Sequence, residues 1–303
     1  MTSPKTTTGT VPFDVPGLGK ECFTWFTVFG DLESGIRPLI ALHGGPGVGH
    51  NYLLSLADLA TGRPVILYDQ LGCGNSTLLP EKSGHTEFWT VQLFLQELDN
   101  LIEHFNIESY DLFGNSWGGM LAAEHALTLP QKLHKLIVAD APASMVDWVI
   151  AAGELRVELP KEVQEALLKN EKDGTTNSAE YEAAVEVFYR LHVCRLNPWP
   201  SEVVDTFNNI KKDSTVYMTM NGPSEFFVIG SLKDWSVKGK LDIITVSTLL
   251  LNGRYDEATD WVTKPYFEEI PRVRWYTFSE SSHMPHWEER DRFMEIVGGF
   301  LED

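Results

Sequence analysis

Short runs typical of β-strands alternate with helical patterns along most of this chain of 303 residues. The strand-like runs are Phe23 to Phe29, Pro38 to Leu42, Pro64 to Tyr68, Tyr110 to Phe113, Leu136 to Ala139, Thr248 to Leu251 and Arg274 to Phe278. The middle runs are apolar throughout, as parallel strands covered on both faces should be. Between the runs, Thr86 to Phe105 and Trp287 to Leu301 carry apolar residues at steps of three and four. The alternation predicts an α/β fold built on a parallel sheet.

The alternation stops between about Pro142 and Ile243, where helical patterns such as Tyr181 to His192 and Ser201 to Lys212 follow one another without a strand. We therefore expect residues 142–243 to form an inserted helical cap (lid), and residues 1–141 and 244–303 to form one core. Such a cap would lie over the carboxyl ends of the strands, where α/β active sites are found, and would select substrates.

The charge balance and the ends of the chain limit its partners and its location. The 24 Lys and Arg residues against 43 Asp and Glu give a net charge of −19, which repels nucleic acids and anionic membranes and mildly favours cationic small molecules. No stretch approaches the roughly 20 apolar residues of a membrane span, and the start lacks the apolar segment of a secretory signal. We expect a cytoplasmic enzyme whose Thr-rich first ten residues are a frayed terminus.

Three cysteines, Cys22, Cys73 and Cys194, are widely spaced and lie outside any C-x-x-C pattern. This spacing predicts neither a disulfide framework nor a zinc site, so we expect ordinary reduced cysteines. No metal and no cofactor are predicted.

A Gly-x-Ser-x-Gly pattern is centred on Ser116, between the strand-like run that ends at Phe113 and a helical pattern that stops before Pro130. A serine hydroxyl becomes a nucleophile when a sharp strand-to-helix turn exposes it and a base takes its proton. Glycines are needed around such a turn because a Cβ would clash there. The order strand, turn, helix favours a catalytic Ser116 over the alternative, a merely structural turn.

A serine nucleophile needs a histidine base and a carboxylate that orients it, and these follow it in the chain order Ser, Asp or Glu, His. Of the nine histidines, His283 lies on a loop just after the last strand-like run and before the final helical pattern, so we predict that it is the base. Asp256 follows the Thr248 to Leu251 run and is the preferred acid. Asp140, which follows Leu136 to Ala139, is the alternative.

The negative charge that forms on the substrate oxygen needs two N–H donors. One usually comes from the residue after the nucleophile, here Trp117. The second should come from the loop His43 to Gly47, which reads His-Gly-Gly-Pro-Gly and follows the Pro38 to Leu42 run. The glycines let the backbone of this loop approach a ligand, although a tight turn without that role has the same composition.

Four motifs together carry a resemblance to a known family: His-Gly-Gly-Pro-Gly at 43–47, Asp-Gln-Leu-Gly-Cys-Gly-Asn-Ser at 69–76, Gly-Asn-Ser-Trp-Gly-Gly at 114–119 and Gly-Arg-Tyr-Asp-Glu at 253–257. In this combination the chain resembles the proline iminopeptidase family of α/β-hydrolases over nearly its whole length. Within the expected cap, Met220 to Phe226 and Leu232 to Trp235 resemble the branch of the tricorn-interacting aminopeptidase and the L-amino acid amidases. The resemblance implies the α/β-hydrolase fold, a mostly parallel eight-stranded sheet with an inserted helical cap.

Carried over to this sequence, the resemblance implies that Ser116 is the nucleophile, Asp256 the acid and His283 the base. It also implies that the N–H groups of Gly45 and Trp117 form the oxyanion hole. The acidic side chains that hold the free α-ammonium of the substrate in that family match Glu225 and Glu257 here. Carboxylates suit this task because a buried ammonium costs several kcal/mol unless it is paired.

Two positions depart from the pattern of the family. Asn115 stands where glycine is frequent, and Glu257 to Asp260 stands where a proline is common nearby. Neither departure touches the three predicted catalytic residues, but both put a strict preference for proline in doubt.

The predicted function is a cofactor-free serine aminopeptidase or amidase that releases a small N-terminal residue, often proline, from short peptides or amino-acid amides. An esterase, lactonase or acyltransferase that acts on a specialised metabolite is the nearest alternative. A non-hydrolytic ligand receptor on the same fold is an alternative of another class. The predicted partner is the small-molecule substrate, with neither nucleic acid nor membrane.

Overall fold

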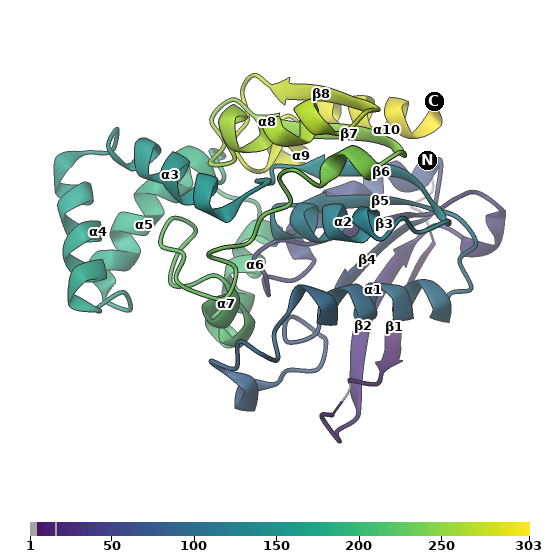
Figure 1. The fold of residues 1–303 in the computed structure, drawn as a ribbon, viewed down its shortest axis with the longest axis horizontal. Helices are drawn as coiled ribbons and strands as arrows, with labels where there is room; N and C mark the ends of the chain where they lie inside the picture. The colour runs from purple at the N-terminus through teal and green to yellow at the C-terminus, as the bar shows by residue number, and fades with distance from the viewer. Residues whose placement is uncertain (1–4, 16) are drawn as a thin grey trace.

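An eight-stranded sheet forms the centre of the protein in a computed structural model that describes residues 5–15 and 17–303 (Figure 1). The strands are β1 Thr6–Phe13, β2 Cys22–Phe29, β3 Leu39–Leu42, β4 Val65–Asp69, β5 Tyr110–Asn115, β6 Leu133–Ala139, β7 Ser247–Gly253 and β8 Val273–Phe278. Their order across the sheet is β1-β2-β4-β3-β5-β6-β7-β8. The pairs β1·β2 and β2·β4 are antiparallel and all others are parallel. The predicted mostly parallel sheet is confirmed.

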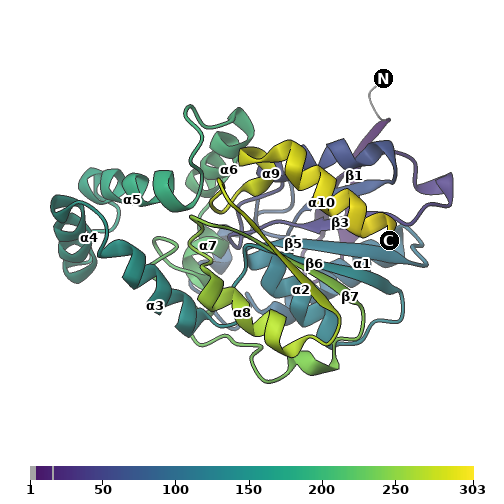
Figure 2. The same cartoon turned by 90° about the horizontal axis from the view of Figure 1, so that it is seen from above.

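Helices cover both faces of the sheet, which is why its central strands are mostly apolar (Figure 2). One face packs against α1 Val91–His104, α2 Trp117–Leu127 and α8 Asp260–Glu269. The other face packs against the 3-10 segment η2 Asn51–Thr61 and the last helix, α10 Arg290–Glu302. All four residues of β3 are at most 1% exposed, because this strand lies mid-sheet between both layers.

The helix predicted from Thr86 begins only at Val91. The Thr90 side chain accepts a hydrogen bond from the Leu93 N–H and so caps the helix start. The remaining short elements are η1 Leu32–Ser34, η3 Pro80–Lys82, η4 Leu241–Ile243 and α9 Pro285–Glu288.

Five helices lie between β6 and β7 in the sequence, and no strand interrupts them. They are α3 Met145–Arg156, α4 Lys161–Asp173, α5 Ala179–His192, α6 Ser201–Lys212 and α7 Thr215–Met220. The helices predicted at Tyr181 to His192 and Ser201 to Lys212 are thus present as α5 and α6. In both views α3, α4 and α5 project beyond the end of the sheet (Figures 1 and 2). They bury a small apolar cluster of their own, which includes Leu167 and Phe188.

The prediction of a frayed terminus is wrong for Thr6 to Thr10, which belong to the edge strand β1. This strand pairs with β2 along its whole length, from Thr6 opposite Phe29 to Phe13 opposite Cys22. The threonines are exposed on the edge, so their composition looks like that of a disordered tail, yet β-branched residues favour strands. Val11 and Phe13 anchor the strand in the core. Residues 1–4 lie outside the described part of the chain.

The three cysteines are unpaired and buried. Within the described ranges, every helix is too short or too polar to span a membrane.

Candidate active site

Ser116 stands on a sharp turn between β5 and α2, with backbone angles φ 58° and ψ −125°. This conformation is strained for a residue with a side chain and typifies an elbow that presents a nucleophile. Close packing on both sides holds the turn. A Cβ on Gly114 would lie 2.0 Å from the carbonyl oxygen of Gly118, and one on Gly118 would lie 2.1 Å from the carbonyl oxygen of Leu42. Any larger residue at these two positions would therefore overlap the neighbouring backbone, as the sequence pattern predicted.

His283 and Asp256 lie in direct contact on the loops that follow β8 and β7. Their side chains form a hydrogen bond of 2.6 Å between His283 Nδ1 and Asp256 Oδ1, an oxygen that also accepts from the Ala258 N–H at 2.8 Å. Burial by itself lowers the pKa of His283, but the charge of Asp256 and the hydrogen bond outweigh it and raise this pKa above its ordinary value. The preferred acid, Asp256, is thus the carboxyl group in contact with the predicted base, and Asp140 is not.

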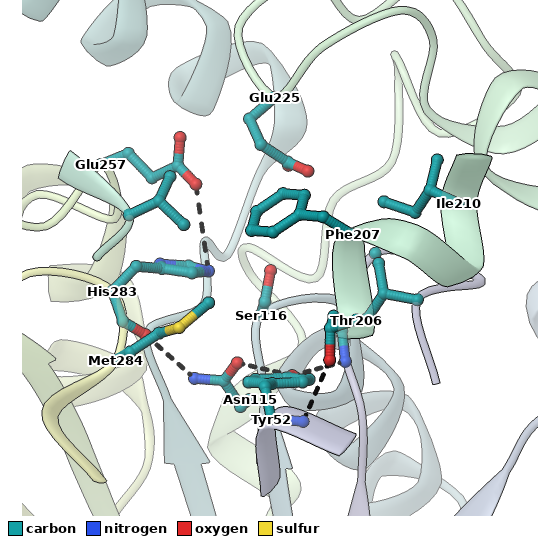
Figure 3. A pocket seen from close by; sticks show the side chains of 14 residues that line it. Tyr52, Asn115, Ser116, Thr206, Phe207, Ile210, Glu225, Glu257, His283 and Met284 are labelled. Atoms are coloured by element: carbon teal, nitrogen blue, oxygen red, sulfur yellow. Dashed lines mark hydrogen bonds and ion pairs between the residues drawn. The ribbon is translucent and has the colours of Figure 1, made fainter. Parts of the chain in front are cut away.

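Ser116 and His283 line the same cavity, whose volume is about 40 Å³ (Figure 3). The Ser116 hydroxyl makes no hydrogen bond within the described chain. Hydrogen bonds between a nucleophile and its base are often long in unliganded enzymes and shorten when substrate binds. The arrangement brings the three predicted catalytic residues to one end of the sheet.

The predicted oxyanion donors, Gly45 and Trp117, line a pocket together with Ser116. Gly45 has φ 107°, and a Cβ there would lie 2.7 Å from a Val48 methyl group, so only glycine fits. The neighbouring Gly44 N–H donates to the Tyr52 hydroxyl at 2.7 Å, which holds this loop beneath Ser116. Trp117 is the first residue of α2, where backbone N–H groups lack partners inside the helix and are free for a ligand.

Glu225 and Glu257 also line the cavity beside Ser116 (Figure 3). Glu225 is held in place: the Tyr217 hydroxyl donates to its Oε1 at 2.7 Å, and the Trp148 Nε1–H donates to its backbone oxygen at 2.6 Å. Glu257 is 1% exposed, and neither of its carboxylate oxygens has a hydrogen-bond partner within the described chain. Nε2 of His283 lies 4.0 Å from Glu257 Oε1 and carries a positive charge only when the imidazole is protonated. The structure thus brings together both glutamates that the resemblance singled out.

Burial raises the pKa of both glutamates above the ordinary value. For Glu257 the charges of Glu225 and Asp256 add to this effect, whereas for Glu225 the Tyr217 hydrogen bond partly offsets it. Closely spaced buried carboxyl groups cannot all stay ionised unless a cation joins them. The arrangement is therefore suited to a positively charged group that enters this end of the cavity.

Tyr217 and Trp148 are residues of the site that the sequence analysis did not single out. Tyr217 lies eight positions before Glu225, which is a weak local signal for a contact. Trp148 lies 77 positions before Glu225, on α3, and no spacing in the sequence relates the two.

One buried group of side chains, His43, Asp69 and Cys73, has the composition of a metal site. Its ligand atoms already have protein partners, however. His43 Nε2 accepts the Gln70 N–H at 3.0 Å, and Asp69 Oδ1 accepts the N–H of His50 at 2.8 Å. These hydrogen bonds hold the loop after β4 against the loop after β3, which is a structural task.

The comparison with known proteins identifies the family. Residues 37–290 match the model of the α/β-hydrolase fold family. A proline iminopeptidase of Heyndrickxia coagulans is 38% identical over 288 residues, which cover 95% of this chain and 96% of that protein. The chain belongs to the proline iminopeptidase family of α/β-hydrolases.

Two solved structures are similar over almost the full length of this family member. The proline iminopeptidase of Mycobacterium smegmatis has a TM-score of 0.88 and 44% identity, with 98% of each chain covered. The structure of VinJ has a TM-score of 0.94 and 50% identity, with 99% of each chain covered. The proline iminopeptidases of Heyndrickxia coagulans and Mycobacterium smegmatis indicate a hydrolase with peptidase activity.

Proposed function

We propose that this protein is a serine aminopeptidase or amidase that releases an N-terminal residue, proline or another small residue, from short peptides or amino-acid amides. The observation that carries the proposal is the carboxyl pair of Glu225 and Glu257 beside Ser116, in which neither oxygen of Glu257 has a hydrogen-bond partner among the described residues. The α-ammonium of a free N-terminus, or the secondary ammonium of an N-terminal proline, would supply the missing cation and donors. The proline iminopeptidases among the relatives support this assignment.

In the proposed reaction the Ser116 oxygen attacks the carbonyl carbon of the N-terminal residue while His283 Nε2 takes the hydroxyl proton. The N–H groups of Gly45 and Trp117 hold the negative carbonyl oxygen, and Asp256 stabilises the imidazolium. When the C–N bond breaks, His283 gives its proton to the leaving amine, which departs as the shortened peptide. Water then attacks the acyl-enzyme by the same steps and releases the amino acid.

The walls of the cavity suit a small apolar residue. Apolar side chains of Val193, Phe207, Ile210 and Met284 line it together with the glutamates. A volume of about 40 Å³ admits little more than a few methyl groups without movement of the walls. We propose that residues 142–243 act as the cap, because Phe207 and Ile210 of α6 and Glu225 belong to that segment.

The test is steady-state hydrolysis of proline and alanine β-naphthylamides beside their N-acetylated forms, with Ser116→Ala as the blank. Only the free-amine substrates should be turned over. Glu257→Gln should raise their KM about tenfold or more, since an ion pair in a buried site is lost, and should leave the hydrolysis of a neutral ester nearly unchanged. Equal losses on amine and ester substrates would contradict the amine-binding role.

Other outcomes would point to the alternatives. Turnover of esters or lactones that depends on Ser116, without turnover of any naphthylamide, would favour an esterase or lactonase. Transfer to an added amine that exceeds hydrolysis would favour an acyltransferase. Stoichiometric acylation of Ser116 without turnover would favour a ligand receptor.

A further inference from the structure

Asp140 is a second buried carboxyl group beside the predicted acid, and the proposed reaction does not use it. It follows β6, has no exposed surface, and adopts φ 52°, which is unusual for a residue other than glycine. Its backbone N–H donates to the Leu251 carbonyl of β7 at 2.8 Å. Because β7 leads into the loop that carries Asp256, this hydrogen bond fixes Asp140 next to the acid.

The two carboxyl groups follow neighbouring parallel strands, β6 and β7, whose last paired residues include Ala139 and Leu251. Asp256 uses its Oδ1 for His283 and the Ala258 N–H, whereas its Oδ2 is buried without a hydrogen-bond partner in the described residues. Asp140 accepts the Asn115 amide on Oδ2 at 2.8 Å, whereas its Oδ1 is likewise buried without a hydrogen-bond partner there. Neighbouring buried carboxyl groups share a proton, because two negative charges close together in a buried site cannot both persist.

The direction of the neighbouring hydrogen bonds assigns that proton. The Gly44 N–H can only donate, so the Tyr52 oxygen accepts from it at 2.7 Å and the Tyr52 hydroxyl must donate to Asn115 Oδ1 at 2.8 Å. The amide nitrogen of Asn115 therefore faces Asp140 and donates to it. Asp140 accepts on one oxygen and has only Asp256 to donate to on the other. Tyr52 and Asn115 lie beneath Ser116 in the view of Figure 3.

We propose that Asp140 is a positioning residue, a neutral carboxylic acid that donates a hydrogen bond to Asp256 Oδ2 and so holds the carboxylate in line with His283. The inference rests on the proposed function, because it assigns a partner to the predicted acid of that reaction. It also explains Asn115, which departs from the glycine frequent in this family: its side-chain amide links the Tyr52 hydroxyl to Asp140, a link that glycine cannot make. The hydrogen bonds thus run in one direction from the loop of Gly44 and Gly45, through Tyr52 and Asn115, to Asp140 and the acid Asp256.

The ionisable groups that act on Asp140 all favour its neutral form. They are Asp256 and Glu288 of α9, while the hydrogen bond from the Asn115 amide acts in the opposite direction. Burial and the charge of Asp256 raise the pKa of Asp140 well above the ordinary value of an aspartate. The imidazole of His283 contacts Oδ1 of Asp256, the carboxylate oxygen opposite the one assigned to Asp140, so the charge of His283 is balanced at Oδ1.

The test compares Asp140→Asn and Asp140→Ala with the parent protein and with Asp173→Asn, the same chemical change on an exposed residue of α4. The readouts are kcat and KM on a neutral ester across the pH range, and the rate at which a fluorophosphonate labels Ser116. The asparagine amide can donate to Asp256 and accept from Asn115, so Asp140→Asn should keep kcat within about threefold. Asp140→Ala should lower kcat and the labelling rate about tenfold to a hundredfold at nearly constant KM, the effect of a lost hydrogen bond to a charged group.

The pH profile separates a neutral from an ionised Asp140. If Asp140 is neutral, its replacement by asparagine does not change the charge near His283. The acid limb of kcat/KM then stays at the same pH in Asp140→Asn. A shift of this limb to lower pH by more than about half a unit would show that a negative charge has been removed, and would overturn the proposal. In infrared spectra, Asp140→Asn should lose the carbonyl band of a protonated carboxyl group, a readout that needs no activity.

Failure of the inference and failure of the proposed function give different results. If the parent protein is neither labelled at Ser116 nor active beyond Ser116→Ala, the proposed reaction is wrong, and the positioning role falls with it. If the parent protein is active and Asp140→Ala matches it in kcat and labelling rate, only the positioning role is wrong. If Asp140→Ala does not fold, the acid limb and the infrared band of Asp140→Asn decide.

Discussion

At the scale of single residues, opposing effects meet at His283. Burial disfavours the imidazolium. Asp256 at 2.6 Å, together with Glu225 and Glu288, favours the imidazolium and outweighs the effect of burial. The proposed reaction needs the neutral imidazole, because only this form accepts the Ser116 proton. The environment that stabilises the imidazolium after proton transfer therefore also sets a lower limit to the working pH.

We expect the acid limb of kcat/KM on a neutral ester to have its midpoint above about 6.5, the ordinary pKa of histidine. The sign follows from the raised pKa of His283: activity is present above this pKa and is lost as the pH falls through it. A pH series with Ser116→Ala as the blank measures the midpoint. In the same Ser116→Ala protein, NMR titration of the ring protons should show His283 titrating above, and His286 below, the ordinary value. A midpoint below 6.5 would contradict the assignment.

Most residues around Ser116 could be predicted because they belong to loops that end consecutive strands. Parallel strands end at one edge, so the residues after β3, β5, β7 and β8 must converge. Trp148 and Tyr217 could not be predicted, because their contacts with Glu225 depend on how the inserted helices pack. Asp140 was weighed only as an alternative acid, since the sequence does not show that two buried carboxyl groups meet.

At the scale of elements, the apolar central strands were predictable and the edge strand was not. Strands buried on both faces have few polar positions, so their sequences stand out. The polar β1 is held by its pairing with β2 and by Val11 and Phe13, neither of which a local pattern shows. Helix boundaries shifted where a side-chain cap decides them, as Thr90 does for α1.

Two glycines inside helices provide a matched pair for testing the elbow. Gly118 of α2 has the carbonyl oxygen of Leu42 2.1 Å from the position of a Cβ, whereas Gly153 of α3 has nothing within 4 Å. Gly118→Ala should lower the free energy of unfolding by about 2 to 4 kcal/mol, since β3 and α2 must separate. Gly153→Ala should raise it by about 0.5 to 1 kcal/mol, since alanine favours helices.

Chemical denaturation of both variants measures these changes, and the labelling rate of Ser116 reports whether the elbow is intact. Gly118→Ala should lose labelling, while Gly153→Ala should keep the parent rate. A Gly118→Ala protein as stable and as reactive as the parent would show that the elbow can shift, against the close packing described above.

At the scale of the whole molecule, a rigid sheet carries Ser116, Asp256 and His283, and a helical segment closes the cavity above them. Two side chains of α6, those of Thr206 and Asn209, hold this wall of the cavity to the core by hydrogen bonds. The Thr206 hydroxyl accepts the Tyr52 N–H at 3.0 Å, and the Asn209 amide donates to the Val48 carbonyl oxygen at 3.1 Å and to Asn51 Oδ1 at 3.0 Å. Because the cavity has a volume of only about 40 Å³, we expect one wall to move when substrate enters, and we expect that wall to be α6, which few polar contacts hold in place.

Asn209→Ala should therefore loosen α6 without disturbing the sheet. Loss of two hydrogen bonds, each worth about 1 kcal/mol, should raise the local opening equilibrium roughly five- to thirtyfold. Hydrogen exchange should speed up in α6 and stay unchanged in β3 to β6, and kcat/KM should rise most for the larger substrates. Asn208→Ala, on the exposed side of the same helix, is the control and should match the parent protein. If exchange in α6 is unchanged in Asn209→Ala, or changes equally in both variants, another wall admits the substrate.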